Sequence, residues 1–318
     1  MVRTFGDDTR RRPHRNMTEQ EIIAILERAG PQTGAQLLEL ARTEVFDLWR
    51  TCRNAPGIRS RIVGKRFLRL DRTVEGYARL SPSIRREFLT YTVLGLEGQG
   101  RQILEKAQQL SEEIQKISRN KLDLARETIG STVAPLRSAA QILEQACFII
   151  AGDITYGMSH AVPRPESSTG KMVRGSDLDI IVVTVDDLPA KAVEELDDAI
   201  FKKKHFLLVH PDYREEIDYL IKNLSKVRVQ LRFDAFESMI ACKIMDEGQL
   251  LYGSAAVFGT VKDLLVAHAI PAKLEDLEKQ AAVMRAEAEI QLSEPGTSPR
   301  GSEFANLFYT QEEGDEIY

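Results

Sequence analysis

The chain has 318 residues, 43% of them hydrophobic, and a formal net charge of −5. This length predicts about two domains with buried cores. The sequence has no run of 18 apolar residues, which argues against a transmembrane helix. Its Arg-rich start lacks the apolar stretch of a secretory signal, and its three scattered cysteines are typical of buried, reduced thiols. We therefore expect a cytoplasmic protein with no membrane partner.

Positive charge is concentrated at one end of the chain. Residues 1–90 contain 18 Lys and Arg against 11 Asp and Glu, and 17 of these 18 cations are arginines. Arginine makes bidentate contacts to phosphate and stacks on bases, so this asymmetry indicates a nucleic-acid partner. A solvated Arg-rich surface would give the same counts. We expect residues 1–16 to be a flexible basic segment preceding the first domain.

The apolar pattern of residues 17–90 predicts three helices and two strands. Helices are expected after Thr18, Thr33 and Thr43, and strands at 58–62 and 66–70, joined by a tight turn as a hairpin. Three helices followed by a hairpin resemble a winged-helix domain, which implies that the third helix and the wing contact DNA or RNA. The cations at these positions are Arg50, Arg53, Arg59, Arg61, Lys65 and Arg66. The alternative role for such a domain is protein docking.

Residues 91–145 are expected to form a helical connector. Ile103, Leu110, Ile117 and Leu124 recur every seven residues in a segment rich in Glu, Lys, Gln and Leu. This stripe is consistent with a homodimer seam, and equally with a long helix that packs on its own chain.

Two carboxylates, Asp177 and Asp179, precede an unbroken apolar run that predicts a buried strand. Because side chains alternate along a strand, both acids point to one face. Two like charges held side by side are unfavourable, and a divalent cation would remove this cost. Mg²⁺ prefers carboxylate oxygens together with substrate phosphates, so the pair predicts a metal–phosphate site. An acidic turn at the end of a strand is the simpler interpretation.

The segment Tyr156-Gly157-Met158-Ser159 follows an apolar stretch and precedes Gly175-Ser176-Asp177-Leu178-Asp179. Gly-x-Ser, a spacer and then Gly-Ser-Asp-x-Asp before a buried strand resemble the nucleotidyltransferase superfamily, which has the fold of DNA polymerase β. Met158 and a long spacer depart from that pattern. The resemblance implies that Asp177 and Asp179 bind Mg²⁺ or Mn²⁺. It also implies that Gly157, Ser159 and Ser176 hold the phosphates of an NTP.

The resemblance implies a third acid on a neighbouring strand, and the sequence offers two candidates. Asp218 lies between apolar residues, as the third acid of that superfamily does. Asp234 also precedes an apolar segment, but Asp234 and Glu237 form a helix capping-box pattern. We favour Asp218 as the third acid, which would bind the catalytic metal. Residues 213–224 are also compatible with a helix, which would leave Asp218 exposed on its surface.

The complete interpretation is an α+β protein with a winged-helix-like domain at 17–90 and a helical connector at 91–145. A small mixed-sheet nucleotidyltransferase domain flanked by helices follows at 146–292, and then a flexible acidic tail at 293–318. The implied enzyme moves a nucleoside monophosphate from an NTP to an unidentified acceptor by a two-metal mechanism. A toxin or defence enzyme that modifies RNA or protein would use the same chemistry. The alternative function is a non-catalytic regulator that senses a nucleotide and binds DNA.

Overall fold

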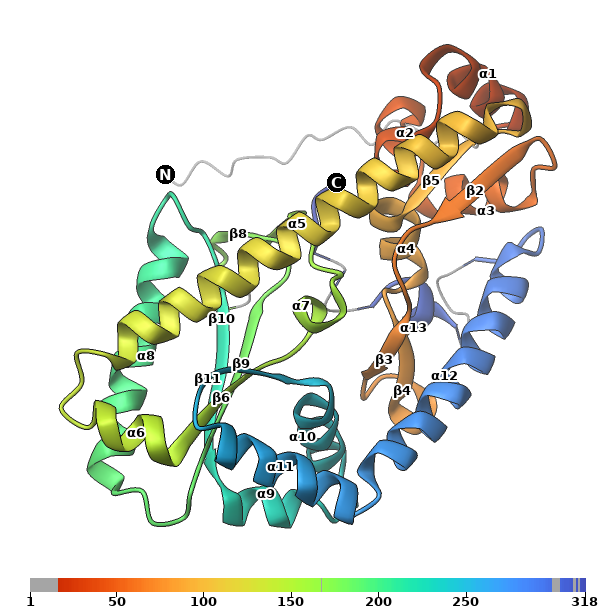
Figure 1. Ribbon diagram of the computed structural model, residues 1–318. Coiled ribbons are helices and arrows are strands. Elements are labelled where there is room, and N and C mark those ends of the chain that lie inside the picture. The colour runs from red at the N-terminus through yellow and green to blue at the C-terminus, as the bar shows by residue number, and fades with distance from the viewer. Residues whose placement is uncertain (1–16, 167, 299–303, 311–312, 314) are drawn as a thin grey trace, which may run out of the picture.

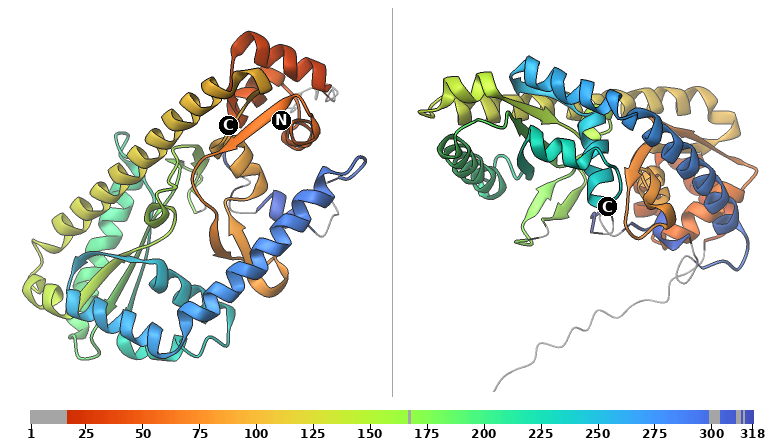
Figure 2. Two further views of the ribbon diagram at one scale, coloured as in Figure 1. Left: turned by 45° about the vertical axis from the view of Figure 1, so that its right-hand side comes forward. Right: turned by 90° about the horizontal axis from the view of Figure 1, so that it is seen from below.

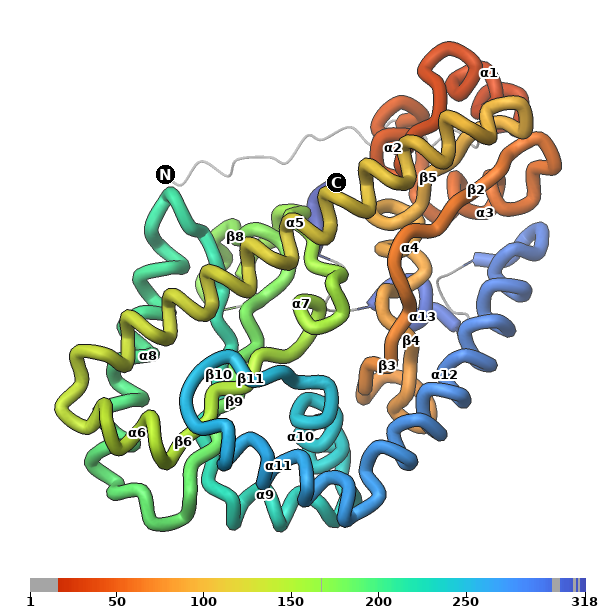
Figure 3. The backbone as a smooth tube through the Cα atoms, in the orientation of Figure 1, coloured from red at the N-terminus to blue at the C-terminus, as the bar shows by residue number. Residues whose placement is uncertain are grey.

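The computed structural model describes residues 17–166, 168–298, 304–310, 313 and 315–318, so the basic segment expected at 1–16 lies outside the described residues. The protein belongs to the α+β class, as expected. Two units lie at opposite ends of the long helix α5 (Gly100–Val133), and helix α12 (Ile270–Ser293) returns the chain from the second unit to the first (Figures 1 and 3).

The first unit contains three helices and a small antiparallel sheet. Its elements are α1 (Glu19–Ala29), β1 (Gln32–Thr33), α2 (Gly34–Ala41), α3 (Val45–Asn54), β2 (Ile58–Ile62), β5 (Thr92–Leu96) and η2 (Glu97–Gln99). The capping box expected at Thr18 begins α1, and a second capping box is found at Thr33, where the beginning of a helix was expected. The third helix is instead preceded by Glu44, whose side chain makes no capping hydrogen bond. The strand order is β1-β5-β2.

We expected the strands at 58–62 and 66–70 to pair with each other as a hairpin, and this prediction is wrong. Strand β2 pairs with β5, while β3 (Phe67–Leu70) pairs with β4 (Ala78–Ser81). The short helix η1 (Glu75–Tyr77) connects β3 to β4, and α4 (Ile84–Tyr91) leads on to β5. Leu68 and Leu70 are buried in the core of the second unit. The short glycine turn between β2 and β3 suggested a hairpin. Burial of these two side chains stabilises the packing of β3 on the second unit instead of its pairing with β2.

Helix α5 is continuous through Gly130 and forms the connector. Its buried positions include Ile103, Ala107, Ile114 and Ala125, which pack against other elements of the same chain. Leu110 and Leu124 are partly buried in the same cores. The apolar stripe is thus used at least in part for packing within the chain. Two further views show the helix spanning both units (Figure 2).

The second unit is built on a four-stranded mixed sheet with strand order β10-β9-β6-β11. Its elements are α6 (Ala139–Gln145), β6 (Ala146–Ile150), α7 (Asp153–Tyr156), β7 (Pro163–Pro165), β8 (Met172–Arg174), β9 (Leu178–Thr184), α8 (Ala190–Val209), β10 (Ile217–Asn223), α9 (Leu224–Gln230), α10 (Phe236–Glu247), β11 (Gln249–Gly253) and α11 (Ala255–Ala267). Strands β9 and β10 are parallel, whereas β6 is antiparallel to both β9 and β11. One face of the sheet packs on α5, α6 and α8 and the other on α9, α10 and α11, so the sheet is covered on both sides.

The described part of 293–318 is packed against the protein, which differs from the flexible tail that its composition predicted. Helix α13 (Ala305–Phe308) places Phe308 in the core of the first unit, edge-on to Phe46 and Trp49. Glu313 and Glu316 are buried as well. The physical reason is that burial of one aromatic anchor, together with ion pairs to arginines, offsets the acidic composition.

All three cysteines are free and buried, as expected. Among the described residues no single helix is long and apolar enough to cross a membrane; α11 and α12, bent by 65° at their junction, meet that criterion only as a pair.

Candidate functional site

Asp179 and Asp218 are neighbours on the two parallel strands of the second unit. Their Cα atoms are paired in the register of β9 and β10, so both side chains leave the same face of the sheet. They line one cavity of about 460 Å³. The remaining lining residues are Arg69, Arg86, Asp153, His160, Arg164, Pro165, Gly175, Ser176, Asp177, Glu216 and Asp315. The cavity therefore combines a cluster of carboxylates with several cations.

Asp179 is a partly buried member of this carboxylate cluster. Burial raises its pKa to about 6; Arg69 opposes the rise, while the charges of Asp218 and Asp153 add to it. The backbone of Gly152 passes so close that a Cβ atom there would lie 2.2 Å from Asp179 Oδ2. Gly152 also has φ +72°, a conformation that favours glycine. The glycine thus brings the end of β6 directly against the carboxylate.

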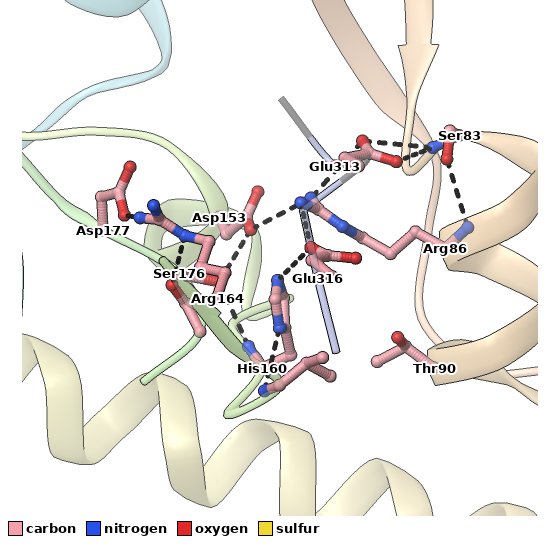
Figure 4. A network of polar contacts seen from close by, with 12 residues as sticks. Ser83, Arg86, Thr90, Asp153, His160, Arg164, Ser176, Asp177, Glu313 and Glu316 are labelled. Atoms are coloured by element: carbon pink, nitrogen blue, oxygen red, sulfur yellow. Dashed lines mark hydrogen bonds and ion pairs between the residues drawn. The ribbon is translucent and has the colours of Figure 1, made fainter. Parts of the chain in front are cut away.

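Asp177 lies in the turn before β9 and forms an ion pair with Arg164 from β7 (Figure 4). Arg164 also contacts Glu216 at 2.9 Å and donates a hydrogen bond from Nε to the carbonyl oxygen of Gly175 at 3.1 Å. One guanidinium therefore bridges the turns that precede β9 and β10. It partly neutralises two carboxylates at the mouth of the cavity.

Asp153, which sequence reasoning missed, is a further carboxylate of the site. It begins α7 immediately after Gly152, and its Oδ2 accepts a hydrogen bond of 2.8 Å from Ser176 Oγ. Ser176 Oγ in turn accepts a 3.2 Å hydrogen bond from the His160 N–H. The signal that would have found Asp153 is Gly-Asp placed directly after the apolar strand 146–150.

The structure does not bring Gly157 and Ser159 into the cavity. Gly157 ends α7 in the left-handed conformation, and the fully buried Ser159 donates its N–H to Ser118 Oγ at 3.0 Å. These two residues shape the loop after α7, whereas Ser176 does line the cavity as expected. The phosphate-holding role we expected for Gly157 and Ser159 therefore has no geometric support.

The structure places the two candidates for the third acid in different surroundings. Asp218 lies on a strand beside Asp179, whereas Asp234 is exposed and is absent from the residues that line the cavity. The expected capping box at Asp234 is also wrong. Helix α10 begins after Ala235, and no side chain caps it. Asp218 is 57% exposed, and its Oδ1 accepts a hydrogen bond of 3.1 Å from Lys204 Nζ.

The cations expected on the recognition helix and wing are largely engaged within the chain. Arg50 contacts Asp47 at 2.9 Å, and Arg53 contacts Glu289 of α12 at 3.2 Å. Arg66 forms partly buried ion pairs with Glu87 at 2.6 Å and Glu289 at 2.7 Å. Arg59 pairs with Glu97 but stays half exposed, and Arg61 and Lys65 are exposed as well, with Lys65 Nζ 5.0 Å from the centroid of the Tyr156 ring. The face of α3 that was expected to read bases thus faces α12 instead.

The donor chemistry of the cavity fits a hard divalent cation, although its side chains do not form a preformed cage. Within the described ranges, no group of three or more His, Cys, Asp or Glu residues is arranged to hold a metal ion. Burial is the main cause of the raised pKa of Asp179, and the negative charges of Asp218 and Asp153 add to it. Mg²⁺ commonly binds through one or two carboxylates plus substrate phosphates, so Asp179 with Asp177 or Asp218 would suffice.

Comparisons of the chain with models of protein families, with curated proteins and with solved structures found no match.

Proposed function

We propose that the protein is a metal-dependent nucleotidyltransferase, which moves a nucleoside monophosphate from an NTP to an acceptor hydroxyl. The observation that carries this proposal is the register of β9 and β10, which sets Asp218 beside Asp179. A third acid beside the Asp-x-Asp pair is the feature that separates a catalytic site from a nucleotide sensor. Its presence favours the enzyme over the regulator.

The fold supports the same proposal. A mixed sheet carries Asp177 and Asp179 at the start of its buried strand β9, with a glycine turn directly after the antiparallel strand β6. In this scheme Gly152 and Asp153 take the place that Gly-Gly or Gly-Ser has in the nucleotidyltransferase pattern. Asp153 is a departure from that pattern, because it adds a negative charge where phosphate would approach.

The side chains of the cavity would divide the chemistry among them. Asp179 and Asp177 would hold Mg²⁺ or Mn²⁺, which supplies charge stabilisation at the reacting phosphate. Asp218 is an exposed carboxylate beside Asp179, so it is placed to accept the proton of an acceptor hydroxyl. Arg164 and Arg86 would bind phosphate oxygens through their planar guanidinium groups. Arg164 must first release Asp177, with which it is paired in the structure.

The element order of the first unit supports a winged-helix-like interpretation. Three helices and the strand order β1-β5-β2 fit that architecture, with residues 63–91 inserted between the two strands of its hairpin. The inserted segment supplies Arg69 and Arg86 to the cavity. We therefore propose that this unit contributes to the catalytic site. If the unit also binds nucleic acid, the exposed cations Arg61 and Lys65 are the residues that would contact it.

The test is to incubate the full chain with each labelled NTP and Mg²⁺ or Mn²⁺, in the presence of pooled RNA, DNA and protein acceptors. We expect metal-dependent transfer of label, lost in the variants Asp179→Asn and Asp218→Asn. Asp187→Asn, an exposed carboxylate that follows β9, serves as the matched control and should retain activity. Transfer that persists in both site variants would exclude this assignment of the carboxylates.

A further inference from the structure

Arg86 on α4 is a deeply buried cation in the wall of the candidate site. Its side chain is 8% exposed, and NH1 lies 3.9 Å from Asp153 Oδ2 across the cavity. A buried guanidinium is strongly unfavourable without negative partners. The identity of those partners therefore determines what the cavity can accept.

The main counter-ions of Arg86 come from a distant part of the chain, which we call the acidic segment (Glu313 and 315–318). Glu316 forms an ion pair with Arg86, and Glu313 Oε1 lies 3.5 Å from Arg86 NH1 (Figure 4). The side chains of Glu313 and Glu316 are 2% and 0% exposed. Glu313 also accepts the Ser83 N–H at 3.2 Å, at the beginning of α4. The segment thus places two carboxylates at one buried guanidinium.

Further contacts hold the backbone of the acidic segment in place. Arg85 donates hydrogen bonds to the carbonyl oxygens of Glu313 at 2.8 Å and Glu316 at 3.3 Å. The Ile317 N–H donates to the carbonyl oxygen of Pro163 at 2.8 Å, and Asp315 lines the cavity itself. The segment therefore lies between α4 and the β7 region, beside the cavity.

The carboxylates satisfy Arg86 incompletely. Within the described part of the chain, the buried Arg86 Nε has no hydrogen-bond partner, although Glu316 Oε1 forms an ion pair with the same guanidinium. His160 Nε2 lies 3.4 Å from Glu316 Oε1, and its Nδ1 accepts the Val162 N–H. Burial and the charge of Arg86 hold the pKa of His160 well below its usual value, so this imidazole is neutral. A phosphate group offers more oxygens than a carboxylate and suits the same donors.

We propose that Glu313 and Glu316 occupy the place of substrate phosphate on Arg86, and that the acidic segment competes in cis with a polyphosphate chain for the cavity. This inference rests on the proposed function, because it concerns the regulation of the same site. It assigns Arg86 as a phosphate-binding residue supplied by the segment inserted in the first unit. It also explains why acidic side chains line the phosphate side of the cavity.

The acidic segment and a polyphosphate compete for Arg86 because both offer the negative charge that this buried cation needs. If the acidic segment left without replacement, Arg86 would lose its two nearest carboxylates and keep only the more distant contact with Asp153 at 3.9 Å, which leaves a buried charge poorly compensated. An incoming polyanion removes that cost, so anion binding and segment release are coupled and act reciprocally. Helix α13 keeps the segment close, because Phe308 stays anchored between Phe46 and Trp49. A tethered competitor acts at a high effective concentration, on the order of millimolar for short flexible links.

The experiment measures binding of inorganic tripolyphosphate by isothermal titration calorimetry to the full chain and to two variants. One variant ends at Thr310 and so retains α13; the other carries Glu313→Gln and Glu316→Gln in the full chain. Glu287→Gln, an exposed carboxylate on α12, is the matched control. If the segment is released in about one tenth of molecules, its removal should lower the Kd about tenfold.

We expect both variants to bind tripolyphosphate at least about tenfold more tightly than the full chain, and the Glu287→Gln control to bind as the full chain does. The double glutamine variant keeps the full length of the segment, so the test stands even if the shortened chain does not fold. An unchanged or raised Kd in the folded variants, or no binding to any of the proteins, would overturn the proposal.

The same proteins separate this inference from the proposed function. Tighter tripolyphosphate binding without NTP turnover in any variant would support the competition and reject nucleotidyl transfer. Metal-dependent turnover with an equal Kd in all variants would support the enzyme and reject the competition.

Discussion

Replacing Asp179 by asparagine should stabilise the metal-free protein, by an amount that grows with pH. The carboxyl is held by burial at a pKa of about 6, against an ordinary value of 3.8. Below pH 3.8 both the folded and the unfolded chain carry the proton, so this group does not affect the free energy of unfolding. Between the two values only the folded chain holds it, and stability falls as pH rises.

The magnitude follows from the two pKa values. One unit corresponds to about 1.36 kcal/mol, so Asp179 lowers the free energy of unfolding by about 3 kcal/mol above pH 6. The amide side chain of the Asp179→Asn variant does not ionise, so the variant lacks this loss. The difference in stability between variant and wild type should therefore increase by about 2.5 kcal/mol between about pH 4 and about pH 7.5.

The assay is urea unfolding followed by far-ultraviolet circular dichroism, with a metal chelator present, at a series of pH values. Comparing each variant with wild type at the same pH cancels the contributions of other titrating groups. Asp187→Asn, an exposed change close in the chain, serves as the matched control. Adding Mg²⁺ at about pH 7.5 should stabilise the wild type more than the variant. A stability difference for Asp179→Asn that is constant or shrinks with pH would refute the reasoning.

Three further predictions concern the loop, the glycine turn and the aromatic anchor. Burial tends to raise the pKa of Glu166, but hydrogen bonds from Ser168 and Thr169 lower it to about 2. Glu166→Gln should therefore lower the free energy of unfolding by roughly 2–3 kcal/mol at about pH 7. In unfolding measured at a series of acid pH values, this loss should vanish as pH falls from 4.5 to about 2. Gly152→Ala forces a Cβ atom against Asp179 and should lower the stability measured in thermal melts by about 1–3 kcal/mol. The control Gly259→Ala, in open space on α11, should be neutral or stabilising. Equal effects of the two changes would contradict the close approach of Gly152 to Asp179. Phe308→Ala should lower the free energy of unfolding by about 3–5 kcal/mol. It should also change the fluorescence of Trp49, the single tryptophan, whose ring centroid lies 5.3 Å from that of Phe308. A loss below about 1 kcal/mol would show that α13 is not an anchor.

Local sequence signals located much of the secondary structure. The capping box at Thr18 and the beginning of a helix at Thr33 are confirmed, because the hydrogen bonds that define such a helix end join residues three apart. The apolar run after Asp179 forms β9, since its side chains are buried on both faces of the sheet. Asp177 and Asp179 could be singled out for the same reason: charges beside a buried strand are unusual in any sequence.

Contacts between distant segments escaped this reasoning. The choice between Asp218 and Asp234 depended on which segment pairs with β9, and spacing along the chain does not encode that pairing. Strand β3 left its apparent hairpin because Leu68 and Leu70 are buried in the other unit. Gly157 and Ser159 matched a pattern, yet the turn that touches Asp179 is made by Gly152, earlier in the chain.

The sequence by itself determined the α+β class, the acidic strand end and the concentration of arginine near the start of the chain. Only the tertiary structure decided what those arginines face. Arg53 and Arg66 meet Glu289 of α12, and Arg86 meets Glu313 and Glu316. A charged side chain looks alike in a sequence whether it faces solvent, a ligand or a carboxylate from the far end of the chain. The distinction arises from burial, because a desolvated cation needs an anion close to it, and the folded chain alone determines which anion is near.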